Sequence, residues 1–173
     1  MAETLVSLAA RFIQSQAELA EHIGGRPALV YEPRKLAVGD EDAEFGATRR
    51  LRTVSAVSSK AIGGGQPMVA FVGKSQTNAF QTRVTVGRTG NNDVVIDDPS
   101  VSRFHAWFEE SQGHAWAIVD AGSKNGTAVA GKKLVPRRKA DLTNGTRIQV
   151  GKVDLAFYTP DGLLQMLAER AQR

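Results

Sequence analysis

The sequence predicts an all-β sandwich or barrel with a helix at each end. From Pro67 onward, short runs such as FQTRVTVG, RFHAWFEE and TRIQVG alternate apolar and polar residues, which is typical of half-buried strands. Turn-forming stretches separate these runs: TGNND, DDPS, SQG, GSKNG and TNG. No helical periodicity interrupts the strands, which disfavours a fold of alternating strands and helices. The sandwich is predicted over residues 66–159.

The two ends of the chain have helical patterns. Residues 1–25 are predicted to form one amphipathic helix that ends at Gly24-Gly25, with apolar groups at Leu5, Leu8, Ala9, Phe12, Ile13, Leu19, Ala20 and Ile23. A second, short helix is predicted over residues 160–173. Thr159 is suited to cap this helix and Pro160 to occupy its first position.

Residues 26–65 are predicted to be a partly flexible linker. PALVY, residues 27–31, is compatible with a short strand. The following segment contains an acidic cluster, a basic cluster and a glycine run, and it has few large apolar residues to offset the entropy of ordering.

Composition excludes several classes of function. The 173 residues contain no cysteine and only three histidines, so thiol catalysis and thiolate metal sites are excluded and a histidine-based metal site is poorly supplied. We expect neither a metal nor a cofactor. No apolar run is long enough to cross a membrane, and the first residues do not resemble a secretory signal, so we expect a soluble, cytoplasmic protein with no membrane partner.

Two enzymatic interpretations fail on spacing. Gly73-Lys74-Ser75 lacks the earlier glycine of a phosphate-binding Walker loop, because Met68 stands at that position. Ser102 and His105 are three apart, so in a strand they would point to opposite faces. A Ser–His contact here is better explained as a hydrogen bond that fixes a loop than as a nucleophile with its base.

A phosphate-binding site is supported by more residues than either enzymatic interpretation. Gly87-Arg88 follows a strand, Ser102-Arg103 lies in a loop, and Ser123-Lys124-Asn125-Gly126 lies in another loop. If these strand ends share one edge of the sandwich, two arginines, a lysine and a hydroxyl converge there. A phosphorylated side chain, with about −1.5 to −2 charges, needs such donors.

The ordered set of motifs resembles the forkhead-associated (FHA) domain family over roughly Pro67 to Thr159. The matching stretches are Gly87-Arg88, Asn92-Asp93, Ser102-Arg103-Phe104-His105 and Ser123-Lys124-Asn125-Gly126-Thr127. The resemblance implies two twisted, mainly antiparallel sheets that bind phosphothreonine peptides, with the threonine methyl distinguishing phosphothreonine from phosphoserine. Two turns depart from the family pattern, at Ala130-Gly131 and Gly145-Thr146.

The resemblance also implies roles for single residues. Arg88 and Ser102 would hold the phosphate, and Arg103 would add a donor to phosphate or peptide. Asn125 would hydrogen-bond the peptide main chain, and Lys124 would contact the phosphothreonine region. The remaining predicted residues support the site: His105 would bond across loops, and tight turns would need Gly87 and Gly126.

The function expected is therefore that of a signalling adaptor, not an enzyme, which binds a phosphothreonine protein downstream of a Ser/Thr kinase. That partner would be the kinase itself or one of its substrates. The main alternative is a phosphate-independent scaffold or oligomerisation protein, and the terminal helices offer surfaces for a homodimer. Nucleic acid is disfavoured because the basic run Lys132–Lys139 has no interleaved aromatic residues. In the linker, Thr48 and Thr53 lie among arginines and are candidate phosphorylation sites.

Overall fold

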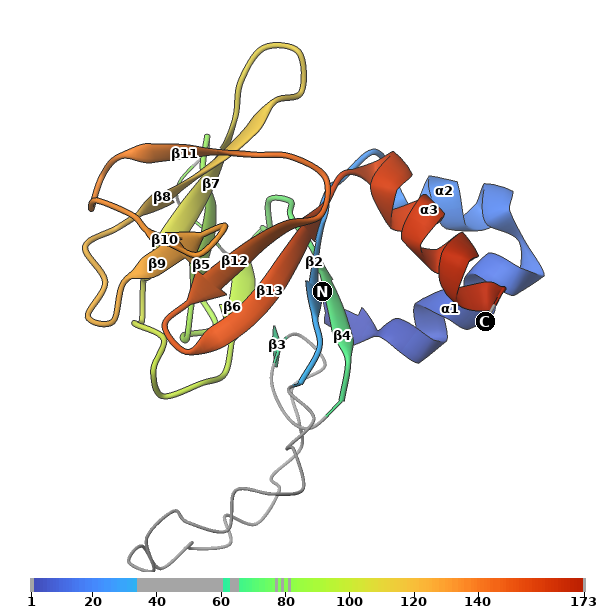
Figure 1. Ribbon diagram of the computed structural model, residues 1–173, viewed down its shortest axis with the longest axis horizontal. Helices are drawn as coiled ribbons and strands as arrows, with labels where there is room; N and C mark the ends of the chain where they lie inside the picture. The colour runs from blue at the N-terminus through green and yellow to red at the C-terminus, as the bar shows by residue number, and fades with distance from the viewer. Residues whose placement is uncertain are drawn as a thin grey trace, which may run out of the picture.

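The chain folds into two stacked β-sheets with three helices on one side (Figure 1). The computed structural model describes residues 2–33, 61–62, 66–76, 78, 80 and 82–172. Most strand pairs are antiparallel, and the two parallel pairs, β3 with β6 and β5 with β6, lie at one edge. The prediction of a mainly antiparallel sandwich with helices at both ends is confirmed.

The first sheet contains seven strands in the order β1-β4-β2-β13-β12-β9-β10. It draws strands from both ends of the described chain: β1 Ala2–Thr4, β2 Ala28–Tyr31, β4 Met68–Phe71, β9 Thr127–Val129, β10 Lys132–Lys133, β12 Thr146–Val150 and β13 Val153–Tyr158. The β12–β13 hairpin is in register from Thr146 opposite Phe157 to Val150 opposite Val153.

The second sheet contains six strands in the order β11-β8-β7-β5-β6-β3. Its strands are β3 Ala61–Ile62, β5 Val84–Gly87, β6 Val94–Ile96, β7 Ala106–Glu110, β8 Trp116–Asp120 and β11 Lys139–Leu142. Strand β7 pairs with β5 on one side and with β8 on the other, and it places Ala106 opposite Asp120.

Where one helix is predicted over residues 1–25, the structure has a strand and two helices. Helix α1 spans Leu5–Gln14 and α2 spans Gln16–Ile23. Ser15 separates them because its backbone is extended (φ −159°, ψ 108°) and its side chain accepts from the backbone N–H of Glu18, which makes it the N-cap of α2. Helix α3 spans Pro160–Ala171, and Thr159 caps it as expected by accepting from the N–H of Gly162.

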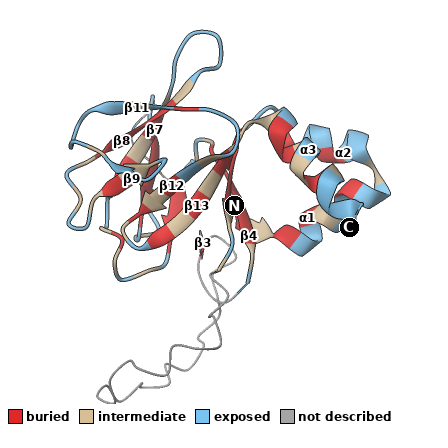
Figure 2. Cartoon of the chain, viewed as in Figure 1, coloured by how far each residue is buried: buried red, intermediate tan, exposed pale blue. Residues whose placement is uncertain are grey.

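The sandwich has one apolar core between its sheets and another under the helices (Figure 2). Between the sheets, the rings of Phe108 and Phe157 lie 6.4 Å apart. Under the helices, Leu8 and Leu163 are fully buried against the outer side of β2 and β4. Burying a side chain of this size contributes about 1.5–3 kcal/mol, so the helices are integral to the fold.

Within residues 27–31, the stretch compatible with a short strand, Ala28–Tyr31 does form β2, and the second core explains why this strand lacks the alternation of the others. Leu29 points to the inter-sheet core, whereas Ala28 and Val30 point to the helices. A strand covered on both faces shows no polar alternation. Strands β2 and β3 both lie within residues 26–65, the range predicted to be a linker, so the sandwich recruits strands from before residue 66.

Candidate anion-binding pocket

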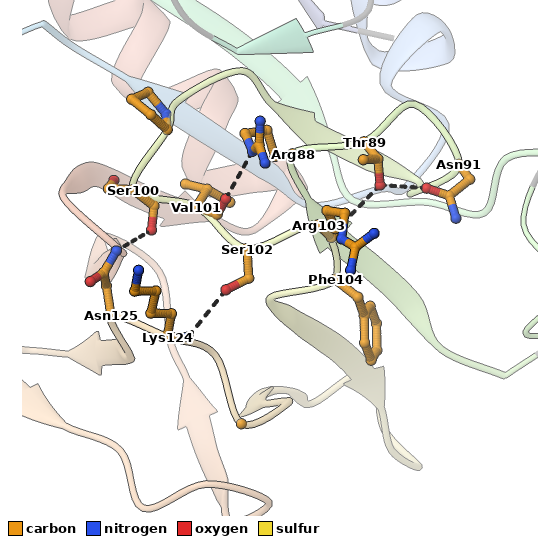
Figure 3. A pocket seen from close by; sticks show the side chains of 12 residues that line it. Arg88, Thr89, Asn91, Ser100, Val101, Ser102, Arg103, Phe104, Lys124 and Asn125 are labelled. Carbon is orange, nitrogen blue, oxygen red and sulfur yellow. Dashed lines mark hydrogen bonds between the residues drawn. The ribbon is translucent and has the colours of Figure 1, made fainter.

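Three loops at one end of the sandwich border an open pocket of about 980 Å³, which we call the anion pocket (Figure 3). They are the loop 88–93 after β5, the loop 97–105 between β6 and β7, and the loop 121–126 between β8 and β9. Strand pairing brings them together, because β5, β7 and β8 are neighbours in one sheet. The pocket is lined by Arg88, Thr89, Asn91, Pro99, Ser100, Val101, Ser102, Arg103, Phe104, Gly122, Lys124 and Asn125.

The charge of the pocket is entirely positive. Arg88, Arg103 and Lys124 are exposed to solvent, and none of the described residues that line the pocket is acidic. Arg88 is oriented by its Nε–H, which donates to the carbonyl of Val101 at 3.3 Å. Three cations around one depression attract an anion and leave guanidinium N–H groups to grip it.

The hydroxyl of Ser102 is fixed by a backbone hydrogen bond from a neighbouring loop. Its Oγ accepts from the backbone N–H of Lys124 at 3.1 Å, which links the loop 97–105 to the loop 121–126 (Figure 3). A hydroxyl that accepts one bond keeps its own proton, so Ser102 is oriented to donate to a ligand.

His105 is fully buried beneath Ser102 and joins the same two loops. Its Nδ1 accepts from the backbone N–H of Ser102 at 3.0 Å, and its Nε2–H donates to the carbonyl of Gly126 at 3.1 Å. Burial lowers the pKa of His105, although the Gly126 carbonyl and the charge of Asp120 act against that effect. Both ring nitrogens are therefore engaged by backbone groups, and neither contacts the Ser102 hydroxyl as a catalytic base would.

Asn125 lies across the pocket from Arg88 on the loop 121–126. Its Nδ2 donates to the carbonyl of Ser100 at 2.6 Å. Ser100 is itself fixed, because its Oγ bonds Asp98 and accepts from the backbone N–H of Lys152 at 2.9 Å. With its amide nitrogen engaged, Asn125 keeps its amide oxygen for a ligand's N–H.

Two glycines allow the loops to approach one another. A Cβ at Gly87 would lie 2.2 Å from the carbonyl oxygen of Arg103 and 2.7 Å from Nδ2 of Asn92, so this position requires glycine for close approach rather than for a turn. Gly126 has φ 82°, a left-handed conformation that favours glycine, and a Cβ there would also meet the side chain of Lys133.

Asp120 is a buried carboxylate that the sequence analysis missed. It accepts from the N–H groups of Gly122 and Ser123 and from the hydroxyls of Ser123 and Thr127, at distances of 2.6–3.0 Å. Burial raises its pKa, but these hydrogen bonds outweigh burial and lower it overall. Asp120 thereby holds the loop 121–126 in shape. The signal was present, since an aspartate three residues before a serine is typical of a side-chain-capped turn.

Asn92 and Asp93 also act from beneath the pocket. Asn92 donates from Nδ2 to the carbonyl of Arg103 at 2.7 Å, which ties the loop 88–93 to the loop 97–105. Asp93 is buried and accepts from Thr85 and Ser75 backbone N–H groups and from Lys74, so the segment after β4 is anchored to the second sheet. Burial raises the pKa of Asp93, but these bonds lower it overall.

All five residues predicted to bind phosphopeptide lie around this one pocket: Arg88, Ser102, Arg103, Lys124 and Asn125. The three residues predicted to support it, Gly87, His105 and Gly126, lie directly behind it in the contacts described above. Thr48 and Thr53 fall outside the described residues. Within the described part of the chain, no group of three or more His, Cys, Asp or Glu side chains is placed to hold a metal, and no helix is both long and apolar enough to cross a membrane.

Comparison with known proteins identifies the region that contains the pocket. The family model described as FHA domain matches residues 84–151. The oxoglutarate dehydrogenase inhibitor of Corynebacterium jeikeium is 40% identical over 77 residues, which is 44% of this chain and 51% of the relative. The glycogen accumulation regulator GarA of Mycolicibacterium smegmatis is 40% identical over 79 residues, which is 46% of this chain and 48% of that protein. The chain thus spans about half the length of these relatives.

Solved structures show a similar match over part of the chain. The N-terminal FHA domain of S. cerevisiae Rad53p, in complex with a phosphothreonine peptide, matches with a TM-score of 0.43 and 23% identity over 49% of this chain and 73% of that one. Mycobacterium tuberculosis EmbR, in complex with a low-affinity phosphopeptide, matches with a TM-score of 0.41 and 28% identity over 45% of this chain and 20% of that one.

Proposed function

We propose that this chain, whose residues 84–151 match the FHA domain model, is a phosphothreonine-binding signalling adaptor rather than an enzyme and acts downstream of a Ser/Thr protein kinase. Its partner is a protein that carries a phosphothreonine, either such a kinase or one of its substrates. The names of two relatives, an oxoglutarate dehydrogenase inhibitor and a glycogen accumulation regulator, support a regulatory role.

One observation carries the proposal: three exposed cations and an oriented hydroxyl surround a pocket that has no acidic lining among its described residues. In the proposed complex, Arg88 and Ser102 hold the phosphate and Arg103 adds a donor. Lys124 contacts the region around the phosphothreonine, and Asn125 bonds the peptide main chain. The fixed positions of Ser102 and Asn125 support this assignment, because little ordering remains to be done when the ligand binds.

The test is fluorescence anisotropy of the full chain against a degenerate phosphothreonine peptide pool, with matched phosphoserine and unphosphorylated pools. We expect selective binding of the phosphothreonine pool. Arg88→Ala and Ser102→Ala should each weaken it by about 1.5–3 kcal/mol, roughly ten- to a hundredfold, because each removes a hydrogen bond to a charged group.

A matched control separates site chemistry from charge alone. Arg138 is exposed in the turn before β11 and does not line the pocket, so Arg138→Ala removes the same charge elsewhere. This variant should bind within about twofold of the wild type, since a distant exposed charge is largely screened. Equal losses in Arg88→Ala and Arg138→Ala, or equal binding of all three pools, would refute the proposal.

A further inference from the structure

A ladder of three aromatic rings lies on the outer face of the second sheet, beside the anion pocket. The rings of Phe80 and Phe104 are 6.0 Å apart with their planes at 13°, and those of Phe104 and Trp107 are 6.0 Å apart at 6°. We call these three residues the aromatic ladder. Phe80 is 52% exposed and Phe104 is 41% exposed, and exposed apolar groups gathered in one place mark interaction sites.

The aromatic ladder is continuous with the proposed phosphate site. Phe104 lines the anion pocket on one side, and on the other it lines a second depression of about 500 Å³ together with Trp107 and Val119. Trp107 follows Ser102 by five residues, and five residues of chain span at most about 18 Å. An extended peptide held at Ser102 therefore reaches Trp107 within about five of its own residues.

The charges around the second depression favour a ligand that carries an acidic group. Arg83, Arg137 and Lys139 line it, and Glu109 is the acid among its described lining residues. Glu109 is already engaged, because its carboxylate accepts from Nε1 of Trp107 at 2.7 Å and contacts Lys139. These two bonds lower the pKa of Glu109 and keep it charged, which leaves an excess of two positive charges.

The arrangement of the rings argues against a stacked nucleic-acid base. One face of Trp107 is turned to Phe104, and the guanidinium of Arg83 lies 4.7 Å from the ring centroid. Phe104 is likewise placed between Phe80 and Trp107. A stacked base needs an open ring face, and the rings of Phe104 and Trp107 each already have two neighbouring groups.

We infer that the aromatic ladder is a second contact site for the same phosphorylated partner, and that it takes an apolar side chain lying within five residues of the phosphothreonine and next to an acidic residue. This inference rests on the proposed function. It assigns to the partner a two-part signal, in which the anion pocket reads the phosphate and the aromatic ladder reads a flanking residue. Aromatic and arginine side chains are the residues that most often dominate such contacts.

The test is selection from a peptide library with a fixed phosphothreonine and five degenerate positions on each side, followed by anisotropy with the best peptide. The variants are Trp107→Thr, which keeps a strand-forming residue in β7, and Phe80→Ser, which alters no strand and does not line the anion pocket. Ile13→Ser, on α1 and 73% exposed, is the matched control for loss of an exposed apolar group.

We expect the wild type and Ile13→Ser to select an apolar residue at one flanking position. Trp107→Thr and Phe80→Ser should lose that selection and bind the best peptide roughly three- to tenfold more weakly, because part of an apolar side chain stays in water. Both should keep their preference for phosphothreonine over threonine. Phe80→Ser keeps the test decisive if Trp107→Thr fails to fold.

Three outcomes would overturn the inference. If the ladder variants select the same flanking residues as the wild type while phosphothreonine binding persists, only this inference fails. If neither the wild type nor any variant binds the phosphothreonine peptides, the proposed function fails together with this inference. If the ladder variants instead lose binding to an oligothymidylate probe, or lose a concentration-dependent dimer, the surface belongs to nucleic acid or to a second copy of the chain.

Discussion

The anion pocket has an exposed rim and a buried support, and the two differ in how their polar groups are used. The rim consists of Arg88, Ser102, Arg103, Lys124 and Asn125, whose hydrogen bonds among the described residues leave donors facing solvent. The support consists of Asn92, His105 and Asp120, which are buried and bonded to the backbone of the three loops. The rim carries the charge, and the support fixes the geometry in which that charge acts.

This difference assigns affinity and stability to different residues. A charged rim residue such as Arg88 or Lys124 is exposed in the free protein, so its removal should change ligand binding and leave folding almost unaffected. A support residue satisfies several buried groups at once, so its removal should unfold the loops and lose binding as a consequence. Substitutions on either side should therefore have separable effects on binding and on stability.

The largest effect is expected for Asp120→Ala. The change leaves two backbone N–H groups and two hydroxyls without their buried acceptor, which should lower the free energy of unfolding by about 3 kcal/mol or more. Chemical denaturation measures this loss. Lys124→Ala, four residues later on the rim, should stay within about 0.5 kcal/mol of the wild type. Similar losses in both variants would show that the rim and the support are not separate.

A smaller effect is expected for Gly87→Ala. The new Cβ would press on the carbonyl of Arg103 and the amide of Asn92, and overpacking of this kind costs about 1–3 kcal/mol. Because the carbonyl belongs to the loop that holds Ser102, phosphothreonine affinity should fall as well.

Gly90→Ala is the matched control for this change, since nothing lies within 4 Å of a Cβ at Gly90 and its backbone is not left-handed. Thermal unfolding and peptide anisotropy of both variants compare them directly. An unchanged Gly87→Ala protein would mean that the loops tolerate a wider separation than the structure shows.

The sequence predicted the rim better than the support, for a physical reason. Rim residues such as Arg88 and Ser102 occur in short motifs at strand ends, and their spacing is visible in the sequence. Asp120 has only the signature of a side-chain-capped turn, an aspartate three residues before a serine, and that signature is the same whether the aspartate is exposed or buried. Residues 27–31 could be named only as compatible with a short strand, since the two faces of β2 are covered by different cores and the strand shows no alternation.

The aromatic ladder was missed because of distance along the chain. Phe80 and Trp107 lie in different segments, and only the pairing of β5 with β7 brings the chain around Arg83 and Trp107 together. The basic run Lys132–Lys139 itself contains no aromatic residue. In the structure, Trp107 on β7 and Lys139 on β11 lie on either side of β8. Together with Arg137 they line the second depression, although they are far apart in the sequence.

The last prediction concerns the dependence of stability on pH and leaves the residues that line the pocket unchanged. The folded-state pKa of His105 is lowered by burial, so below the ordinary histidine value of about 6.5 the unfolded chain binds a proton that the folded chain resists. The free energy of unfolding should therefore decrease as the pH falls from 7 through 6, and continue to decrease until the folded-state pKa is reached.

Urea denaturation at several pH values measures this slope for the wild type and for His105→Gln, which has no titratable ring. His105→Gln should be less stable at pH 7, because a buried bond to Ser102 or Gly126 is lost, but its stability should change less between pH 7 and pH 6. His114→Gln changes a histidine whose side chain is 93% exposed in the turn after β7, so it should leave the dependence of the wild type intact. If His105→Gln kept the full slope, proton uptake by another group would be loosening the loops, and the role of His105 in the support would be geometric alone.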